Sequence, residues 1–246
     1  MACKLMPVRW IKEDSMRKAM TVAAVALTCA VATNARASAD GDAKRLAEAA
    51  TVLKEIHAAP DKDIPMELWE KAHCVAVIPS VKKAAFIVGG EYGKGVLSCR
   101  NGGNWSAPSF LSLQKGSVGF QIGGESVDLV LLFMTDQSVN RLFDNKIALG
   151  AETSVAAGPV GRDARAMTDG QLKAQILSYS RAQGLFAGID LTGGVLKPDT
   201  SENREFYGRN YTAREILKDR KVNPPASADA FLAALKTTVP ARTQQQ

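Results

Sequence analysis

The sequence predicts an α+β fold, in which helices from both ends of the domain pack on a curved, largely antiparallel, barrel-like sheet. Three observations support this prediction. Amphipathic helical patterns occupy residues 40–59 and 227–236. Between them lies a series of short apolar segments with the alternation or continuous apolarity typical of strands. Glycines recur within these segments, and glycine-rich strands favour a curved sheet over a flat one.

The first helix is predicted over residues 40–59 and ends at Pro60. One face of its helical wheel is apolar, and this face contains Ala43, Leu46, Ala49, Ala50, Leu53 and Ile56. The polar face carries Lys44, Arg45 and Lys54 against Asp42, Glu48 and Glu55, so its charges cancel. A membrane-surface helix needs a strongly basic polar face, so packing onto the sheet is the favoured interpretation. A second short helix is expected over residues 64–72, with Pro65 near its start.

The stretch from Ala84 to Gly124 decides the fold class. Its glycines, Gly89 to Gly95, resemble a phosphate-binding loop, but β-prone residues flank them and no helix pattern follows. We therefore expect hairpins, with the glycines supplying turns, a bulge or close strand packing. Strands are expected over 74–78, stopped by Pro79, and over 85–88, 95–99, 110–113, 118–122 and 129–134, with a turn at 101–104.

The second half of the chain continues the mixed pattern. The apolar run 129–134 predicts a strand covered on both faces. Leu177 and Tyr179 are expected on one side of a strand, and Ile176 and Ser178 on the other. The remaining expectations are a helix over 136–142 capped by Asp136, an extended segment over 147–157, a strand pair within 171–188, surface helices over 198–207 and 212–217, a final helix capped by Ser227, and a disordered tail ending at Gln246.

The N-terminal segment has the order of a secretory signal peptide. Arg17 and Lys18 precede an uncharged apolar run over 19–32, and small-residue cleavage patterns follow at 35–39. A retained anchor is the main alternative, Met16 is an alternative start, and Cys29 raises the question of a lipoprotein, although the preceding residues fit a lipidation box poorly. We expect three parts: a signal peptide over 1–39, one domain over 40–220, and a C-terminal helix and tail over 221–246.

Removal of the signal peptide changes the charge balance. Of the 31 Lys and Arg residues, six lie in residues 1–39, together with two of the 25 acidic residues, which leaves a net charge of +2 in place of +6. Nucleic-acid binding therefore loses its main support. Cys74 and Cys99 remain, and an even pair in an exported protein suggests a disulfide that stabilises the fold by about 3 kcal/mol. Two buried free thiols are the alternative.

Five sequence blocks together resemble the SYLF-domain family of lipid-binding proteins, in its bacterial exported branch. The blocks are CVAVIPSVKKAAFIVGGEYGKGVLSCR, WSAPSF, GSVGFQIGG, SVAAGPVGR and ILSYSRAQGLFAGIDL, and the resemblance runs from about Lys44 to Leu217. Eukaryotic members bind phosphoinositides, and an amphipathic segment at the start of the domain, matching residues 40–59 here, is usually held responsible. Bacteria generally lack those lipids, so the resemblance implies lipid binding without naming a headgroup.

The motifs of common enzymes are missing from the sequence. There is no G-x-S-x-G pattern, and Gly95 stands where a Walker A loop needs Ser or Thr. A structural zinc site needs about four ligands, and here it would have to use all of His57, His73, Cys74 and Cys99. We therefore expect no metal and no cofactor. The carboxylates are scattered, and most are expected at surfaces or in turns. A hydrolase with an unrecognised site is the weakest of the alternatives.

Two surfaces could bind lipid. One is the polar face of the first helix, with Lys44, Arg45 and Lys54. The other is a set of cations with one aromatic residue, namely Lys82, Lys83, Lys94, Arg100 and Trp105. A loop Trp beside cations suits a lipid–water interface, although Trp105 folded over the core is the alternative.

The sequence thus predicts an exported, periplasmic or secreted protein without enzymatic activity. It would bind lipid or an anionic membrane through its cationic and amphipathic surface, or take lipid into an apolar groove between helix and sheet. The alternative is a module of the cell envelope that binds another protein and has no affinity for lipid.

Overall fold

The computed structural model describes residues 40–56, 63–85, 88–101, 104–118, 123–144, 146–161, 169–182 and 185–238. The predicted signal peptide, Cys29, His57 and the C-terminal tail lie outside these residues. The chain divides after Gly41, and the compact unit Asp42–Gln246 is the one considered below.

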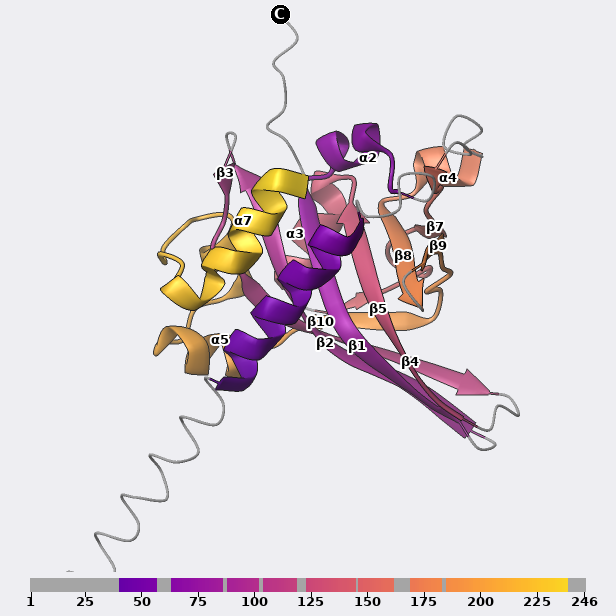
Figure 1. Ribbon diagram of the computed structural model, residues 1–246, viewed down its shortest axis with the longest axis horizontal. Helices are drawn as coiled ribbons and strands as arrows, with labels where there is room; N and C mark the ends of the chain where they lie inside the picture. Colours follow the sequence, from indigo (N-terminus) through magenta and orange to yellow (C-terminus); the bar gives the residue numbers. More distant parts are fainter. Residues whose placement is uncertain are drawn as a thin grey trace, which may run out of the picture. The chain divides into compact units, whose positions relative to one another are not determined.

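A curled sheet forms the centre of the α+β fold, as the sequence predicts (Figure 1). The order of its main path is β6-β10-β4-β2-β1-β5-β8-β7, with β3 paired to β2 and β9 paired to β8. All pairs are antiparallel except β7 with β8. The strands are β1 (Cys74–Ala85), β2 (Val88–Asn101), β3 (Asn104–Trp105), β4 (Ser109–Val118), β5 (Gly123–Phe133), β6 (Ile147–Ala148), β7 (Val155–Ala157), β8 (Ile176–Ala182), β9 (Leu185–Gly188) and β10 (Gly194–Pro198).

Helices cover the sheet on both faces. A helix over residues 40–56, called the leading helix here, precedes the others. The others are α2 (Met66–Lys71), α3 (Asp136–Asp144), α4 (Asp169–Lys173), α5 (Thr200–Tyr207), α6 (Ala213–Leu217) and α7 (Asp229–Thr238), with a 3-10 turn at Ala226–Ala228. The leading helix and α7 lie side by side over one face of the sheet (Figure 1).

Alternation along the strands divides the core in two. Val75 and Val77 of β1 pack with the leading helix, α2 and α7, whereas Cys74 and Ala76 pack with α3 and α6 on the opposite face. We call these the leading-helix face and the α3 face. The predicted double coverage of 129–134 is confirmed for β5, since Val130 contributes to one core and Leu131 to the other. Leu177 and Tyr179 share the leading-helix face, also as predicted.

Gly89, Gly90, Gly93 and Gly95 lie inside a strand rather than in a turn, so the predicted hairpin of 85–88 with 95–99 is wrong in its boundaries. The first hairpin joins β1 to β2, and Gly89 to Gly95 are part of β2. A Cβ atom on Gly93 would come within 2.7 Å of Ile78 and Val81, and one on Gly95 within 2.7 Å of Ile78. These two glycines therefore permit close strand packing, which confirms that part of the expectation.

Pro79 does not stop the first strand. β1 continues to Ala85 because a register shift between Ile78 and Val81 places Pro79 in a bulge, where it owes no hydrogen bond to the ladder. Ser80 takes a positive φ of 54° at this bulge, and its N–H donates to Asp128 Oδ1 at 2.9 Å. Of the strand predicted over 118–122, Val118 belongs to β4 and residues 119–122 lie outside the described residues.

Three helix expectations need correction. The N–H of Ser138 is met by Thr135 Oγ1 at 3.3 Å, so Thr135 rather than Asp136 caps α3. Ser227 lies within a 3-10 turn and caps no helix. The predicted surface helices α5 and α6 have buried sides, formed by Glu202 and Asn203 of α5 and by Ala213, Ile216 and Leu217 of α6. Both helices are short, so their few apolar residues do not form a stripe from which a buried side could be predicted.

The predicted disulfide between Cys74 and Cys99 is confirmed. The two cysteines are direct partners in the β1–β2 ladder, with Cα atoms 4.0 Å apart. This bond removes both thiols from any set of metal ligands.

Candidate functional site

An uncovered row of side chains crosses the four central strands. Tyr92 of β2 is the register partner of both Lys82 of β1 and Gln114 of β4, and Lys82 also pairs with Ser126 of β5. Register partners in antiparallel strands share a face of the sheet. All four residues are exposed, and 46% of Tyr92 is accessible to solvent. We call Lys82, Tyr92, Gln114 and Ser126 the exposed row.

The exposed row lies on the leading-helix face, where the strands extend past the helices. Figure 1 shows β1, β2, β4 and β5 continuing beyond the helical layer toward the lower right. Two residues further along this face stand Gly90 of β2 and Gly116 of β4, which are paired and exposed. A Cβ atom on Gly116 would meet nothing within 4 Å. The surface is therefore flat here, without a packing reason inside the protein for its glycines.

A partly buried cluster of charged groups borders the exposed row. Lys94 lies two residues after Tyr92 on the same face of β2, and its Nζ lies 3.2 Å from Asp199 Oδ2 and 3.2 Å from Glu202 Oε2. Arg45 of the leading helix also pairs with Glu202, and its Nη1 lies 3.4 Å from Asp42 Oδ1. We call Asp42, Arg45, Lys94, Asp199 and Glu202 the charge cluster.

The surroundings of the charge cluster alter its ionisation. Burial, followed by interactions with Glu202, raises the pKa of Asp42 to about 7. Burial would also raise the pKa of Asp199, but hydrogen bonds from Ser201, from the Glu202 N–H and from Lys94 lower it to about 2. Burial would lower the pKa of Lys94, yet Asp199 and Glu202 raise it.

The predicted lipid-binding cations do not form one surface. Lys82 and Lys83 lie within β1 rather than between strands. Arg45 and Lys94 belong to the charge cluster, where acids compensate them. Lys44 and Lys54 are both exposed on the leading helix, and the Nζ of Lys44 lies 3.8 Å from Glu48 Oε1.

Arg100 and Trp105 lie at the other end of the β1–β2 hairpin. The Cys74–Cys99 pair marks that end, while Lys82 lies near the turn. The Arg100 guanidinium stacks 5.0 Å from the centre of the Trp105 ring, and Trp105 packs against the leading-helix core. Trp105 is therefore folded over the core, which is the alternative given in the sequence analysis.

A groove separates the leading helix from the sheet beside the bulge. Its volume is about 310 Å³. Ala47, Thr51 and Val52 line it from the helix, and Pro79 and Ser80 line it from β1. Lys44 and Arg181 lie at the same groove, and Arg181 is held by Asp128 at 2.8 Å and by Glu55. The sequence analysis placed an apolar groove between helix and sheet, but the lining of this groove is mixed.

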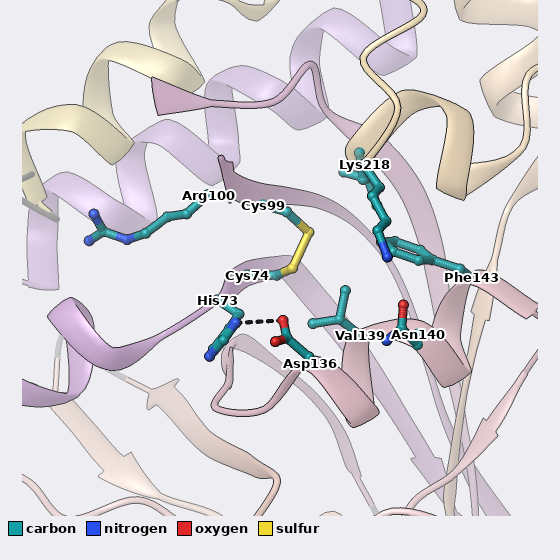
Figure 2. Close-up of a pocket in the computed structure, with 10 residues that line it drawn as sticks. His73, Cys74, Cys99, Arg100, Asp136, Val139, Asn140, Phe143 and Lys218 are labelled. Atoms are coloured by element: carbon teal, nitrogen blue, oxygen red, sulfur yellow. Dashed lines mark ion pairs between the residues drawn. A yellow bond between two sulfur atoms is a disulfide. The ribbon is translucent and has the colours of Figure 1, made fainter. Parts of the chain in front are cut away.

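A second cavity of about 390 Å³ opens beside the disulfide (Figure 2). His73 Nδ1 lies 2.8 Å from Asp136 at its edge, while Val139 and Phe143 provide apolar walls. Figure 2 shows the Arg100 guanidinium turned away from the disulfide, so that this cation does not converge on the cavity with Lys218. The arrangement contains no nucleophile paired with a base.

Neither a metal site nor a membrane-spanning helix is found in the described residues. No group of three or more His, Cys, Asp or Glu side chains gathers there as ligands would. Within the same residues, every helix is too short or too polar to cross a bilayer.

The residues that sequence reasoning missed are polar groups buried within amphipathic helices. Asp42 was assigned to the solvated face of the leading helix, but it is only 2% exposed. Asn203 of α5 is fully buried, and its Oδ1 accepts from the Phe110 N–H at 2.8 Å. A charged residue one turn before an apolar stripe is a common surface pattern, so spacing alone could not reveal these contacts.

Comparison with known proteins agrees with the resemblance found in the sequence. The family described as "Ysc84: Las17-binding protein actin regulator" matches residues 114–238. LAS seventeen-binding protein 3 of Saccharomyces cerevisiae is 35% identical over 181 residues, which cover 72% of this chain and 39% of the yeast protein. SH3 domain-containing YSC84-like protein 1 of Homo sapiens is 34% identical over 194 residues, covering 77% of this chain and 56% of the human protein.

These relatives are longer proteins, and the chain spans between about two fifths and three fifths of their length. The family description and the name of the yeast protein refer to binding and regulation rather than catalysis. The order of the sequence blocks, the family match and the identity to these relatives agree. The chain belongs to the Ysc84, or SYLF-domain, family.

Proposed function

We propose that this chain is a binding module without catalytic activity that associates with anionic lipid surfaces through the exposed row. The observation that supports this proposal is the uncovered pairing of Lys82 with Tyr92 on the central strands, where these extend past the helices. A flat surface with a cation and an amphipathic aromatic side chain suits the lipid–water interface, where Tyr is enriched.

Charge supports the same proposal. Lys82 is exposed, and neither of its partners in the ladder, Tyr92 and Ser126, is acidic. A Lys near an anionic membrane contributes about 1 kcal/mol, and the contribution weakens with salt. The second cation near this face, Lys44, stands at the mouth of the groove and is 78% exposed.

A protein partner is the second candidate function. The relatives' names point to it, because the yeast protein is named for binding LAS seventeen. The same flat surface with its exposed Tyr92 would suit a protein interface, where Tyr is enriched.

Flotation with lipid vesicles separates the two candidates. The mature domain, beginning at Asp40, is mixed with vesicles of phosphatidylglycerol and phosphatidylcholine, or of phosphatidylcholine alone. We expect flotation with the anionic vesicles only, and a loss of binding between 50 mM and 500 mM salt. An absence of flotation with both vesicle types would contradict the lipid proposal and favour a protein partner, whereas equal recovery with both would contradict the requirement for anionic lipid.

We also propose that the chain is exported to the periplasm, on the basis of the apolar run 19–32 and the small residues that follow it. Mass spectrometry of the protein from a fractionated bacterial host tests this. We expect a periplasmic product that begins near Asp40, whereas an intact N-terminus in the cytosolic fraction would contradict export.

A further inference from the structure

The charge cluster joins three elements at the start of the leading helix. Asp42 and Arg45 come from the helix, Lys94 from β2, and Asp199 and Glu202 from α5 and its cap. Three carboxyl groups thus face two cations. The cluster is electrically balanced only when one carboxyl group holds a proton, and burial makes an unbalanced charge costly.

Asp42 is the carboxyl group with the weakest compensation. Its Oδ1 lies 3.4 Å from Arg45, whereas Glu202 pairs with both Arg45 and Lys94, and Asp199 also pairs with Lys94. Its Oδ2 is buried and has no hydrogen-bond partner in the described part of the chain. A proton on Asp42 would supply a donor toward Glu202. It would also remove the poorly compensated negative charge. Glu205 of α5 adds further negative charge nearby.

We propose that the charge cluster is a pH-responsive latch, which fastens the first turns of the leading helix to β2 and α5 when Asp42 is protonated and loosens them when all three carboxyl groups are ionised. The apolar face of the same helix is buried through Leu46, Ala49 and Leu53. Loosening would give this face access to the surface that borders the exposed row, since Lys94 and Tyr92 are two residues apart on one strand.

The direction of the pH effect follows from proton linkage. The folded state holds the Asp42 proton up to about pH 7, whereas the opened state releases it near the ordinary value of 3.8. The closed state therefore binds more protons between these values, and opening becomes easier as the pH rises through this range. Above about pH 7 the effect levels off.

Hydrogen exchange of the backbone amides in residues 42–56 measures the latch directly and without lipid. After correction for intrinsic exchange, the opening constant of the wild-type helix should rise up to about tenfold per pH unit between pH 5 and 7. Asp42→Asn keeps a donor toward Glu202 without a charge, so its opening constant should stay flat. Asp229→Asn is the matched control, because Asp229 is exposed in the first turn of α7, and it should retain the wild-type profile.

A wild-type profile that Asp42→Asn leaves unchanged would overturn the latch, as would a flat profile in the wild type. If Asp42→Asn does not fold, Glu202→Gln serves the same purpose, because it also balances the cluster. The effect of the latch on membrane binding rests on the proposed function and is measured separately, by flotation at pH 6 and pH 8. Failure to float at either pH would count against the proposed function, while the exchange profile would still decide the latch.

Discussion

Arg45 of the leading helix and Glu202 of α5 form an ion pair although 157 positions separate them in the chain. The Glu202 side chain is 7% exposed and that of Arg45 is 17% exposed. The Arg45 guanidinium also lies 5.6 Å from the centre of the Phe110 ring in β4. One arginine thus connects the first described helix to the sheet and to a helix near the end of the domain.

Replacement of Arg45 by Met should strongly destabilise the fold. The substitution preserves much of the side-chain volume but leaves the buried Glu202 with Lys94 as its remaining cation, and loss of one partner from a buried pair costs about 3 kcal/mol. Urea unfolding should show this loss. Lys44→Met, at the exposed neighbouring position, should change the free energy of unfolding by less than about 1 kcal/mol. Equal effects of the two substitutions would contradict the buried pair.

Asp199 should make the fold sensitive to acid. Its folded-state pKa of about 2 lies below the ordinary value of 3.8, so its stabilising effect is complete above about pH 4 and disappears as the pH falls toward 2. We expect a loss of about 2 kcal/mol over this range. Asp199→Asn should remove that part of the acid dependence, whereas Asp144→Asn, at a side chain 72% exposed, should preserve it. If the free energy of unfolding falls in the same way below about pH 4 in all three proteins, Asp199 does not cause the sensitivity to acid.

Two glycines in the central strands should respond differently to Ala. At Gly95 the new methyl group would collide with Ile78, and overpacking of this kind costs about 1 to 3 kcal/mol. At Gly116 the space is open, so Ala should be neutral or stabilise by up to about 1 kcal/mol. Thermal unfolding of Gly95→Ala and Gly116→Ala measures both. A stable Gly95→Ala variant would argue against the close packing of β1 on β2.

The disulfide should contribute about 3 kcal/mol to stability on the chain-entropy account. A variant with both Cys74→Ala and Cys99→Ala should unfold at lower urea concentration than the oxidised wild type. Reductant should lower the stability of the wild type and leave that of the variant unchanged. If reductant has no effect on the wild type, the bond does not support the fold.

Much of the fold could be predicted from the sequence because its pattern depends on local periodicity. The apolar stripe of the leading helix and the continuous apolar run of β5 each identify an element and its buried side. The strand boundaries around Pro79 and Gly89 could not be predicted in the same way. Both residues are strong turn formers in isolation, and only the neighbouring strands show that Pro79 occupies a bulge and that Gly89 lies within β2.

The candidate site was predicted in part. Lys82 was identified by its charge, but its partner Tyr92 lies ten residues away, and only the register between β1 and β2 brings them together. The charge cluster depends on contacts between residues 42 and 202, which no spacing within either segment reveals. Arg45 and Lys94 were selected as lipid-binding cations for the same reason, because the sequence does not show the acids that surround them.

The affinity of Lys82→Glu for vesicles containing phosphatidylglycerol tests the central claim most directly. Reversal of one charge at the membrane should cost about 2 kcal/mol, which corresponds to an approximately thirtyfold weaker affinity. Lys236→Glu makes the same change of charge at an exposed position on α7, away from the extended strands (Figure 1), and should bind like the wild type. Equal affinities for Lys82→Glu and the wild type would contradict lipid binding through the exposed row.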